Sequence, residues 1–417
     1  MKKKLISSSI LGIFLTLVIV FLFYNQYLYP TIMPIIDEGK LRIFADWTAI
    51  ISANVCLDQG YDVYLENPCD FANRKHVYGN LLLFMPFIEK FPNFYYIYLP
   101  FIFCFLFLSV ISYLLFDKKF KKYWLSFLIL IFSIPVLLIV ERSNTDILIF
   151  IFLILISSTK SFFLSFFLIM ISSLSKFYPI LFSSIFVFGG NFKKKIFQIL
   201  GTILIFLIAI NYNWDSYVKI FSFKSEFSGT GMHIFSIHGI TDFLKYFKIP
   251  TYNYDFNWIK YLYLLLIVIV PIFYLNYKYH KKINFIFSKV EFYEKIDFEG
   301  KLYFVSSTVI IFCYFIISNY VYREIYILGL VPLIVSLKLK DNDNFLYFFY
   351  LLIFTKFLIT TISTFMFQNG IFPYYGSFFI VLKHTIDVYL ISVILHVYFY
   401  FIKYSFKKIT NQVPQNV

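Results

Sequence analysis

The stretch "FYYIYLPFIFCFLFLSVISYLLF", residues 94–116, decides the fold class of this 417-residue chain. It contains no charged residue, and the basic cluster "DKKFKK" (117–122) follows it directly. A hydrocarbon core of about 30 Å is crossed by roughly 20 residues of α-helix. The stretch therefore predicts a membrane-spanning helix, and the basic cluster predicts that its end lies on the cytoplasmic side.

The composition extends this prediction to the whole chain. The sequence is 60% hydrophobic and only 14% charged, whereas soluble domains contain about one quarter charged residues. The net charge of +14 comes from short basic clusters between apolar runs, not from one basic surface. We therefore expect an integral membrane protein in contact with membrane lipids, without a nucleic-acid partner.

Apolar runs recur along the sequence and predict an all-α, polytopic membrane helix bundle of about 12 spans, within a range of 10–13. We expect a single domain over residues 1–417. The runs are 6–28, 94–116, 124–140, 146–158, 161–175, 177–190, 196–211, 259–277, 302–319, 324–338, 344–367 and 377–402.

The basic clusters predict the orientation of the bundle. They lie at residues 2–4, 117–122, 193–195, 278–282, 338–340 and 403–408, which all fall on one side of the membrane. The positive-inside bias makes that side cytoplasmic, so both termini are expected there, with a short tail at 409–417. The chain is thus expected to be a multi-pass protein of the cell membrane. Residues 29–93 then form a large first extracytoplasmic loop, and 212–258 form another.

The first apolar run could also be a signal peptide. It lacks a small-residue cleavage site, and "YNQYLYP" follows instead, so we expect an uncleaved span. The sequence contains no phosphate-binding Walker motif, no His/Cys metal spacing and no nucleophile elbow. We therefore expect neither a cofactor nor a metal ion.

The cysteines fall into two groups. Cys104 and Cys313 lie in apolar runs and are expected to be small buried hydrophobic residues. Cys56 and Cys69 share the first outer loop, where a disulfide would stabilise the fold by about 3 kcal/mol. Two unpaired thiols are the alternative.

Charged residues within spans are costly and usually line a cavity, pair with one another or act on a substrate. Except for Lys356, those of this chain lie at or just below the outer face in the expected topology. Each has a structural interpretation: spacings of four residues permit neutralising pairs, and Lys176 could reach outward to lipid headgroups. Their recurrence at one depth predicts instead an outward-facing cavity lined with cations, below Asp46. The residues are Glu141, Arg142, Asp146, Lys176, Arg323, Lys356, Lys383, His384 and Asp387.

A lipid-linked sugar phosphate fits such a cavity. Its isoprenoid tail stays in the bilayer while its phosphate binds cations, for which we expect Arg142, Lys176 and Arg323. Single-displacement, inverting transfer of the sugar needs one carboxylate as general base, and Asp46 is the candidate. Phosphate is a good leaving group, so no partner acid is required.

Several segments resemble the membrane glycosyltransferases of family 87, which have the GT-C fold. The segment "ADWTAIISANVCLDQGYDVY" (45–64) is similar to the first outer loop of that family, with Gly60, Asp62 and Tyr64 in its turn. Five further segments match in the same order over roughly residues 40–330. They are "HVYGNLLLFMP" (76–86), "VERSNTD" (140–146), "SKFYP" (175–179), "GMHIFSIHGITDFL" (231–244) and "YVYRE" (320–324). Ser143 stands where that family usually has Gly, and His233 where Asn is expected.

The resemblance implies a metal-independent hexosyltransferase, of the mannosyltransferase type, with Asp46 as its catalytic base. It implies transfer of mannose or another hexose from a polyprenyl-phosphate donor to a lipid or glycan acceptor at the outer face. The sugar, acceptor and oligomeric state are left open. The candidate substrate-binding residues are Asp62, Tyr64, Tyr78, Asn144, Asp146, Tyr178, His233 and His238.

Other functions also fit a polytopic protein of this kind. A transporter or flippase for lipid-linked glycans would more often show repeated halves and helices broken by Gly or Pro. An O-antigen polymerase or ligase would carry its large outer loop late in the chain. A purely structural membrane subunit would leave the layer of charges without a role. Asp46 itself has a structural alternative, which is to cap the helix that follows it.

Overall fold

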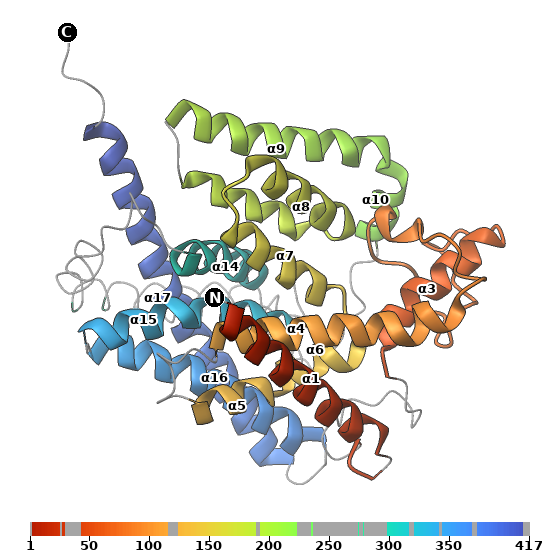
Figure 1. Ribbon diagram of the computed structural model, residues 1–417, viewed down its shortest axis with the longest axis horizontal. Coiled ribbons are helices and arrows are strands. Elements are labelled where there is room, and N and C mark those ends of the chain that lie inside the picture. The colour runs from red at the N-terminus through yellow and green to blue at the C-terminus, as the bar shows by residue number, and fades with distance from the viewer. Residues whose placement is uncertain are drawn as a thin grey trace, which may run out of the picture. The chain divides into compact units, whose positions relative to one another are not determined.

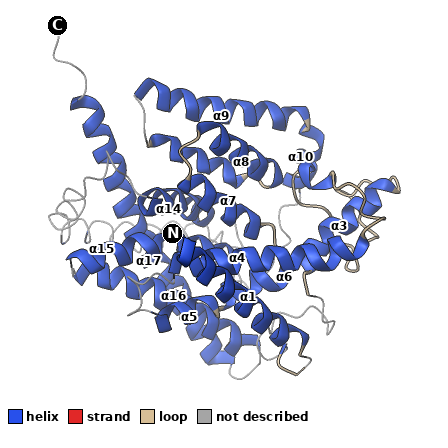
Figure 2. Ribbon diagram, in the orientation of Figure 1, coloured by secondary structure: helices blue, strands red, loops and turns tan. Residues whose placement is uncertain are grey.

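The computed structural model describes residues 2–25, 27–29, 43–115, 124–188, 192–222, 235–236, 274, 278, 298–316, 321–341, 344–368 and 373–411. All regular secondary structure in these residues is helical (Figure 2). The predicted all-α class is confirmed. Of the candidate site residues, His233 and His238 lie outside the described residues, as does most of the predicted span 259–277.

The chain forms two compact units. Unit 1 consists of Met1–Ser183 and Leu200–Phe227, and unit 2 of Ser184–Ile199 and Ser228–Val417. The expectation of one domain over residues 1–417 stays a prediction.

Unit 1 contains the helices α1 and α4 and the segment 43–93, which is predicted to lie in the first outer loop (Figure 1). Its apolar helices α1 and α4 pack closely, because Gly12 faces Ser109 and a Cβ on Gly12 would lie 2.0 Å from the Ser109 Oγ. Small residues permit such an approach between membrane helices. The elements are α1 (Lys2–Tyr24), α3 (Ala45–Asp58), η1 (Asn80–Leu83), η2 (Phe94–Tyr98), α4 (Leu99–Leu115), α5 (Trp124–Ile131), α6 (Ile134–Arg142), α7 (Asp146–Ser158), α8 (Phe162–Ser175) and α10 (Trp214–Ser222).

The segment 45–83 of unit 1, predicted to lie in the first outer loop, contributes to a small hydrophobic core. Side chains of α3, of the loop that follows it and of α10 pack together there, and a disulfide joins Cys56 to Cys69 at its edge. Burial of these side chains holds α3 in place. The core consists of Ala53, Cys56, Val63, Tyr64, Leu83, Tyr217 and Ile220.

Unit 2 contains the helices α14 (Phe298–Ile316), η6 (Val321–Leu330), α15 (Val331–Asp341), α16 (Asn344–Gln368) and α17 (Pro373–Asn411). Gly329 of η6 lies against α14, where a Cβ on it would come within 2.1 Å of the Ser306 Oγ. The Tyr398 ring of α17 stacks on Phe304 of α14 with 4.9 Å between ring centroids. Two further helices, η4 (Tyr178–Val187) and α9 (Phe192–Tyr212), pass from one unit to the other.

Six helices of the described residues are long and apolar enough to cross a membrane. They contain Lys4–Tyr24, Phe94–Leu115, Lys193–Tyr212, Phe298–Ile316, Asn344–Met366 and Phe378–Phe399. The pair α5–α6, bent by 45°, is a seventh if it counts as one span. The chain is therefore a multi-pass membrane protein with an all-α helix bundle.

The expected number of about 12 spans is larger than the number of these candidate spans. Three of the predicted runs form the helices α7, α8 and η4, which have 13, 14 and 10 residues and are shorter than the roughly 20 residues that a straight span needs. The predicted run 324–338 is divided between η6 and α15. The number of 12 and the GT-C arrangement stay predictions.

Candidate active site

Asp46 lies in the first turn of α3, and the backbone before it fixes where that turn begins. Phe44, at the N-cap position, has a left-handed backbone with φ 66° and makes no side-chain cap bond. Its amide donates to the Glu141 carbonyl oxygen at 2.6 Å, so α3 begins against the end of α6. The structure therefore does not support the capping interpretation of Asp46, since Phe44 holds that position and the carboxylate is bonded elsewhere.

Trp47 fixes the same turn from the other side. Its Nε1 donates to the Tyr95 carbonyl oxygen at 2.9 Å, and its ring packs edge-on against Phe103 at 4.9 Å. The side chain is buried. The start of α3 is thus held against both α6 and the π-helical turn η2 that leads into α4.

Three polar side chains surround the Asp46 carboxylate. The Asn144 Nδ2 donates to Oδ2 at 2.6 Å, and the Arg142 Nη1 donates to Oδ1 at 3.3 Å. The Arg74 Nη1 lies 3.7 Å from Oδ1. The Asp46 side chain remains 14% exposed and that of Arg142 20% exposed, so both groups can be reached from outside the protein.

Asn144 is the centre of this network. It lies in the turn between α6 and α7, which Ser143 makes possible by adopting a left-handed backbone with φ 43°. The Asn144 Oδ1 accepts from the Lys176 Nζ at 2.7 Å and from the Asp146 amide at 3.0 Å, while its Nδ2 also lies 3.5 Å from the Tyr78 hydroxyl. One amide side chain therefore connects the expected base to the expected cation Lys176.

Lys176 and Asp146 form a buried ion pair below Asn144. The Lys176 Nζ lies 2.7 Å from the Asp146 Oδ1, and the Tyr178 hydroxyl donates to the same oxygen at 2.6 Å. The Nζ also lies 5.2 Å from the centroid of the Tyr78 ring, within cation–π range. Lys176 is therefore a buried, paired cation and does not reach outward to lipid headgroups.

The possible pair of Arg142 with Asp146, four residues apart, is not formed. The turn at Ser143 breaks the helix between them, so the two side chains do not share a helix face. Arg142 pairs with Asp46, and Asp146 pairs with Lys176. Seven predicted site residues meet in this network: Asp46, Tyr78, Arg142, Asn144, Asp146, Lys176 and Tyr178.

Sequence reasoning missed Arg74. Its Nε and Nη2 bind the two oxygens of Asp70 at 2.9 and 2.8 Å, and the Nη2 also donates to the Ala45 carbonyl oxygen at 2.8 Å. Burial opposes the charge on Arg74, but the pairing with Asp70 and the charge of Asp46 outweigh it and raise its pKa. A sequence signal existed, because Asp70 and Arg74 are four residues apart next to a cysteine, but only charges near apolar runs were considered.

In the part of the chain that the structure describes, the cations around Asp46 are paired with carboxylates. The cations Arg74, Arg142 and Lys176 each have a carboxylate within 4 Å, namely Asp70, Asp46 and Asp146. Glu141 adds a fourth carboxylate, 3.9 Å from the Arg142 Nε and 2.5 Å from the Tyr29 hydroxyl. Among the described residues these carboxylates neutralise the cations, so an anion that bound here would displace one of them.

Asp62 and Tyr64 belong to a separate cluster on the far side of His76. Asp62 pairs with Lys219 of α10 at 2.5 Å, and the Tyr64 hydroxyl donates to Asn80. The His76 ring lies between Tyr64 and Tyr78, with centroids 5.4 and 5.7 Å away. Burial lowers the pKa of His76 to about 4, so this ring is neutral near pH 7.

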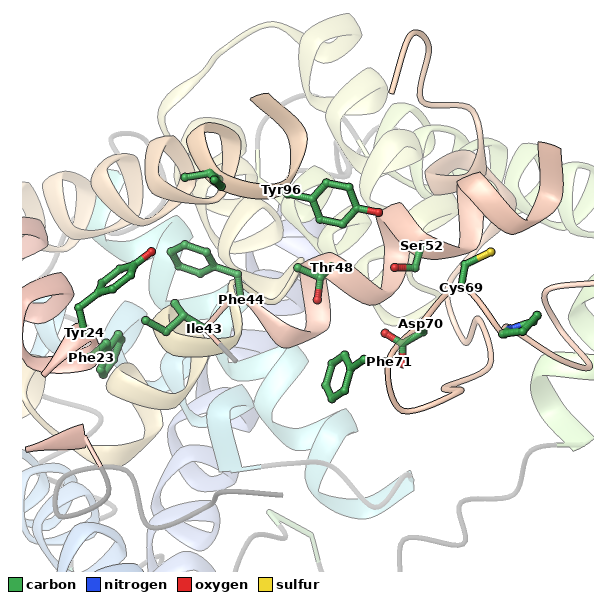
Figure 3. Close-up of a pocket in the computed structure, with 12 residues that line it drawn as sticks. Phe23, Tyr24, Ile43, Phe44, Thr48, Ser52, Cys69, Asp70, Phe71 and Tyr96 are labelled. Atoms are coloured by element: carbon green, nitrogen blue, oxygen red, sulfur yellow. The ribbon is translucent and has the colours of Figure 1, made fainter. Parts of the chain in front are cut away.

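A pocket of about 640 Å³ lies beside α3 in unit 1 (Figure 3). Thr48 and Ser52 line it from α3, Tyr96 lines it from η2, and Phe23 and Tyr24 line it from the end of α1. Asp70 completes the wall and joins the pocket to Asp46 through Arg74. Asp46 and Arg142 are not among the residues that line this pocket.

Arg323 is the one predicted phosphate-binding residue in unit 2, where it lies half-buried in η6. Lys356 of α16 lies in a fully buried ion-pair network with charged side chains of η6 and α17. The Lys356 Nζ lies 2.8 Å from Glu324 and 2.6 Å from Asp387, and Lys383 lies 3.5 Å from Asp387. The two lysines and the two carboxylates, Glu324 and Asp387, therefore neutralise one another inside the unit and line no cationic surface. The convergence of Arg323 with Arg142 and Lys176 stays a prediction.

Within the described part of the chain, no group of three or more His, Cys, Asp or Glu side chains has the arrangement of a metal site. Comparisons of the chain with family models, curated proteins and solved structures find no match.

Proposed function

We propose that this multi-pass membrane protein is a GT-C-like glycosyltransferase that transfers a hexose, with mannose as the first candidate, from a polyprenyl-phosphate donor to a lipid or glycan acceptor. The reaction takes place at the outer face of the cell membrane, with both termini in the cytoplasm. The observation that carries the proposal is the Asp46 carboxylate, which is fixed by Asn144 and Arg142 and still partly exposed. A carboxylate held in this way suits a general base.

The chemistry is a single displacement. The Asp46 carboxylate takes the proton of the acceptor hydroxyl, and the acceptor oxygen forms a bond to C1 of the hexose. The bond between C1 and the phosphate oxygen breaks, and polyprenyl phosphate leaves with the electron pair. Because attack and departure occur on opposite sides of C1, the configuration at that carbon inverts.

Arg142 is the cation best suited to the donor phosphate. It is the more exposed partner of a single 3.3 Å hydrogen bond to Asp46, and a guanidinium can bind two phosphate oxygens at once. In our proposal the phosphate draws Arg142 away from Asp46, which frees Oδ1 for the acceptor proton. Lys176 keeps Asn144 oriented from below, and Arg323 is a second phosphate-binding candidate.

The pocket beside α3 supports an acceptor with hydroxyl groups. It combines aromatic rings with the hydroxyls of Thr48, Ser52 and Tyr96, and it lies beside the end of α1 and the turn η2 that precedes α4. Aromatic faces and hydroxyls together suit the two kinds of surface on a sugar or polyol headgroup.

The test is incubation of membranes containing the protein with radiolabelled polyprenyl-phosphate hexoses and identification of the labelled product. We expect one labelled hexose to be added to an acceptor, with free polyprenyl phosphate released. Membranes without the protein are the control. Transfer of a preassembled glycan would indicate a polymerase or ligase, and movement of the donor across the membrane without transfer would indicate a flippase; either result contradicts the proposal.

A further inference from the structure

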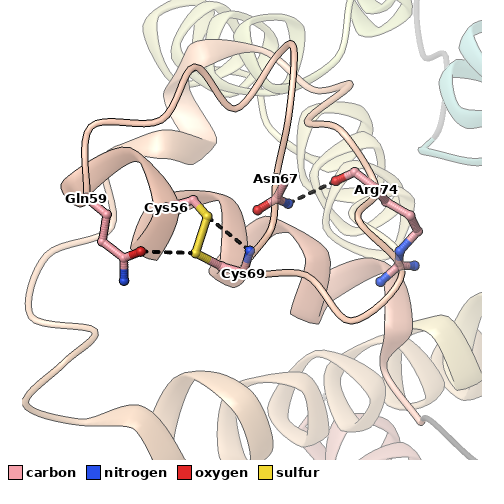
Figure 4. The surroundings of a disulfide bond; sticks show 5 residues. All are labelled: Cys56, Gln59, Asn67, Cys69 and Arg74. Atoms are coloured by element: carbon pink, nitrogen blue, oxygen red, sulfur yellow. Dashed lines mark hydrogen bonds between the residues drawn. A yellow bond between two sulfur atoms is a disulfide. The ribbon is translucent and has the colours of Figure 1, made fainter.

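The loop between Cys69 and His76 reaches from the disulfide to the carboxylate of Asp46. Cys56 belongs to α3, the helix that carries Asp46, and Cys69 belongs to the loop (Figure 4). The Cys69 amide also donates to the Cys56 Sγ at 3.1 Å. The disulfide therefore ties the loop to the same helix on which the proposed base lies.

From this attachment, hydrogen bonds lead to Arg74. Asp70, the residue after Cys69, accepts the Arg74 amide and Ala72 amide at 3.1 Å each, and it holds the guanidinium through both oxygens. The Asn67 Nδ2 donates to the Arg74 carbonyl oxygen at 2.9 Å. The Asp70 side chain is fully buried, whereas the Arg74 side chain is 28% exposed.

The guanidinium acts on the start of α3 at two points. Its Nη2 binds the Ala45 carbonyl oxygen at 2.8 Å, and its Nη1 lies 3.7 Å from the Asp46 Oδ1. A planar fork with fixed donors can hold a carboxylate and a carbonyl at once, whereas a lysine ammonium is a point charge without that geometry.

We propose that Arg74 is a positioning residue for Asp46 and that the Cys56–Cys69 disulfide is what fixes Arg74. Arg74 orients the base without binding the donor, and loss of the disulfide acts on catalysis through Arg74. The expected effect on turnover rests on the proposed function. The claim that Arg74 and the disulfide hold the start of α3 in place does not.

The kinetic test compares Arg74→Gln, Arg74→Lys and the matched control Lys75→Gln, which removes a positive charge from an exposed neighbour in the same loop. We expect Arg74→Gln to lower kcat by about 10- to 100-fold with the KM for the donor unchanged, because small misplacements of a catalytic group cost factors of this size. Arg74→Lys should recover only a minor part of the rate, and Lys75→Gln should leave it unchanged. A raised donor KM with kcat unchanged would show that Arg74 binds phosphate and would overturn the inference, as would full activity of Arg74→Lys.

The link to the disulfide is tested by combining variants. Cys56→Ser with Cys69→Ser should lower kcat about as much as Arg74→Gln does, and adding Arg74→Gln should lower it no further. Independent, multiplicative losses would contradict a role of the disulfide through Arg74.

A second readout does not depend on the reaction. Hydrogen exchange of the Thr48 amide, which donates to the Phe44 carbonyl oxygen, and of the amides after it reports opening at the start of α3. We expect faster exchange over residues 44–52 in Arg74→Gln and in the serine variant, with exchange in α7 unchanged. If the wild type transfers no sugar, the proposed function fails, but the exchange rates still test whether Arg74 holds the start of α3. Unchanged exchange in Arg74→Gln would overturn that role of Arg74.

Discussion

At the scale of single residues, Ser143 adopts a backbone conformation that favours glycine. Its φ of 43° lies in the left-handed region, which costs a residue with a Cβ about 1–2 kcal/mol. This strain turns the chain between α6 and α7 and places Asn144 beside Asp46. A glycine at position 143 would relieve this strain.

The first prediction follows from this strain. We expect Ser143→Gly to be more stable than Ser143→Ala by about 1 kcal/mol, because both lose the hydroxyl but only glycine relieves the backbone. Thermal unfolding in detergent, with both variants compared in the same buffer, measures the difference. Equal midpoints would show that the turn is not strained.

The second prediction concerns His76, whose pKa burial lowers to about 4 from an ordinary 6.5. Between these values the unfolded chain binds a proton that the folded loop excludes. Above pH 6.5 His76 is neutral in both states and does not lower the free energy of unfolding. As the pH falls from 6.5 towards 4, protonation of the unfolded chain lowers the free energy of unfolding by roughly 3 kcal/mol. His76→Phe keeps an aromatic ring between Tyr64 and Tyr78 but cannot be protonated.

Midpoints of thermal unfolding at pH 7.5 and pH 4.5 test this. The wild type should lose more stability on acidification than His76→Phe does. The same loss in both proteins would rule out His76 as the cause.

At the scale of elements, the contact between the segment 76–83 and the end of α8 holds Tyr78 beside Lys176. The Gly79 amide donates to the Ser175 carbonyl oxygen at 2.9 Å, and a Cβ on Gly79 would lie 1.8 Å from the Leu174 carbonyl oxygen. Both neighbouring groups are backbone and cannot rotate away.

We therefore expect Gly79→Ala to destabilise unit 1 by about 1–3 kcal/mol and to lower transfer, because the two segments must separate. Gly201→Ala is the control, since nothing lies within 4 Å of a Cβ at that helical position and alanine favours a helix. Thermal unfolding and the transfer assay measure the two effects. An unchanged Gly79→Ala protein would show that this contact does not position the site.

The elements and the site could be predicted from the sequence to different degrees. The turn at 143–145 and the cap of α8 at Lys176 lie at the ends of apolar runs, so their polar side chains could be recognised from sequence alone. The contact of Asp62 with Lys219 and that of Arg74 with Asp46 could not, because Lys219 is far along the chain and the loop geometry depends on the disulfide. Spacing likewise indicated the pair Lys383–Asp387 but not the contact of Lys356 with Glu324.

At the scale of the whole molecule, the apolar helices establish a multi-pass protein, and the basic clusters predict its orientation. Lys75 is exposed in the predicted first outer loop, whereas Lys119 belongs to a predicted cytoplasmic cluster. We expect a cysteine at Lys75 to react with a membrane-impermeant maleimide on intact cells, and a cysteine at Lys119 to react only after permeabilisation. The native Cys104 and Cys313 are buried, and Cys56 and Cys69 are joined, so they contribute little background. Labelling of the Lys119 position alone on intact cells would contradict the predicted orientation, because Asp46 would then lie on the cytoplasmic side.

The central claim is that Asp46 is the general base, and the rate of sugar transfer by Asp46→Asn tests it most directly. Asparagine keeps the shape of the side chain in the first turn of α3 but cannot accept the acceptor proton. The control is Asp58→Asn, an exposed carboxylate at the other end of the same helix. We predict a loss in kcat of about 10²-fold or more for Asp46→Asn, with the protein still folded in the membrane, and full activity for Asp58→Asn. Near-wild-type transfer by a folded Asp46→Asn protein would contradict the account.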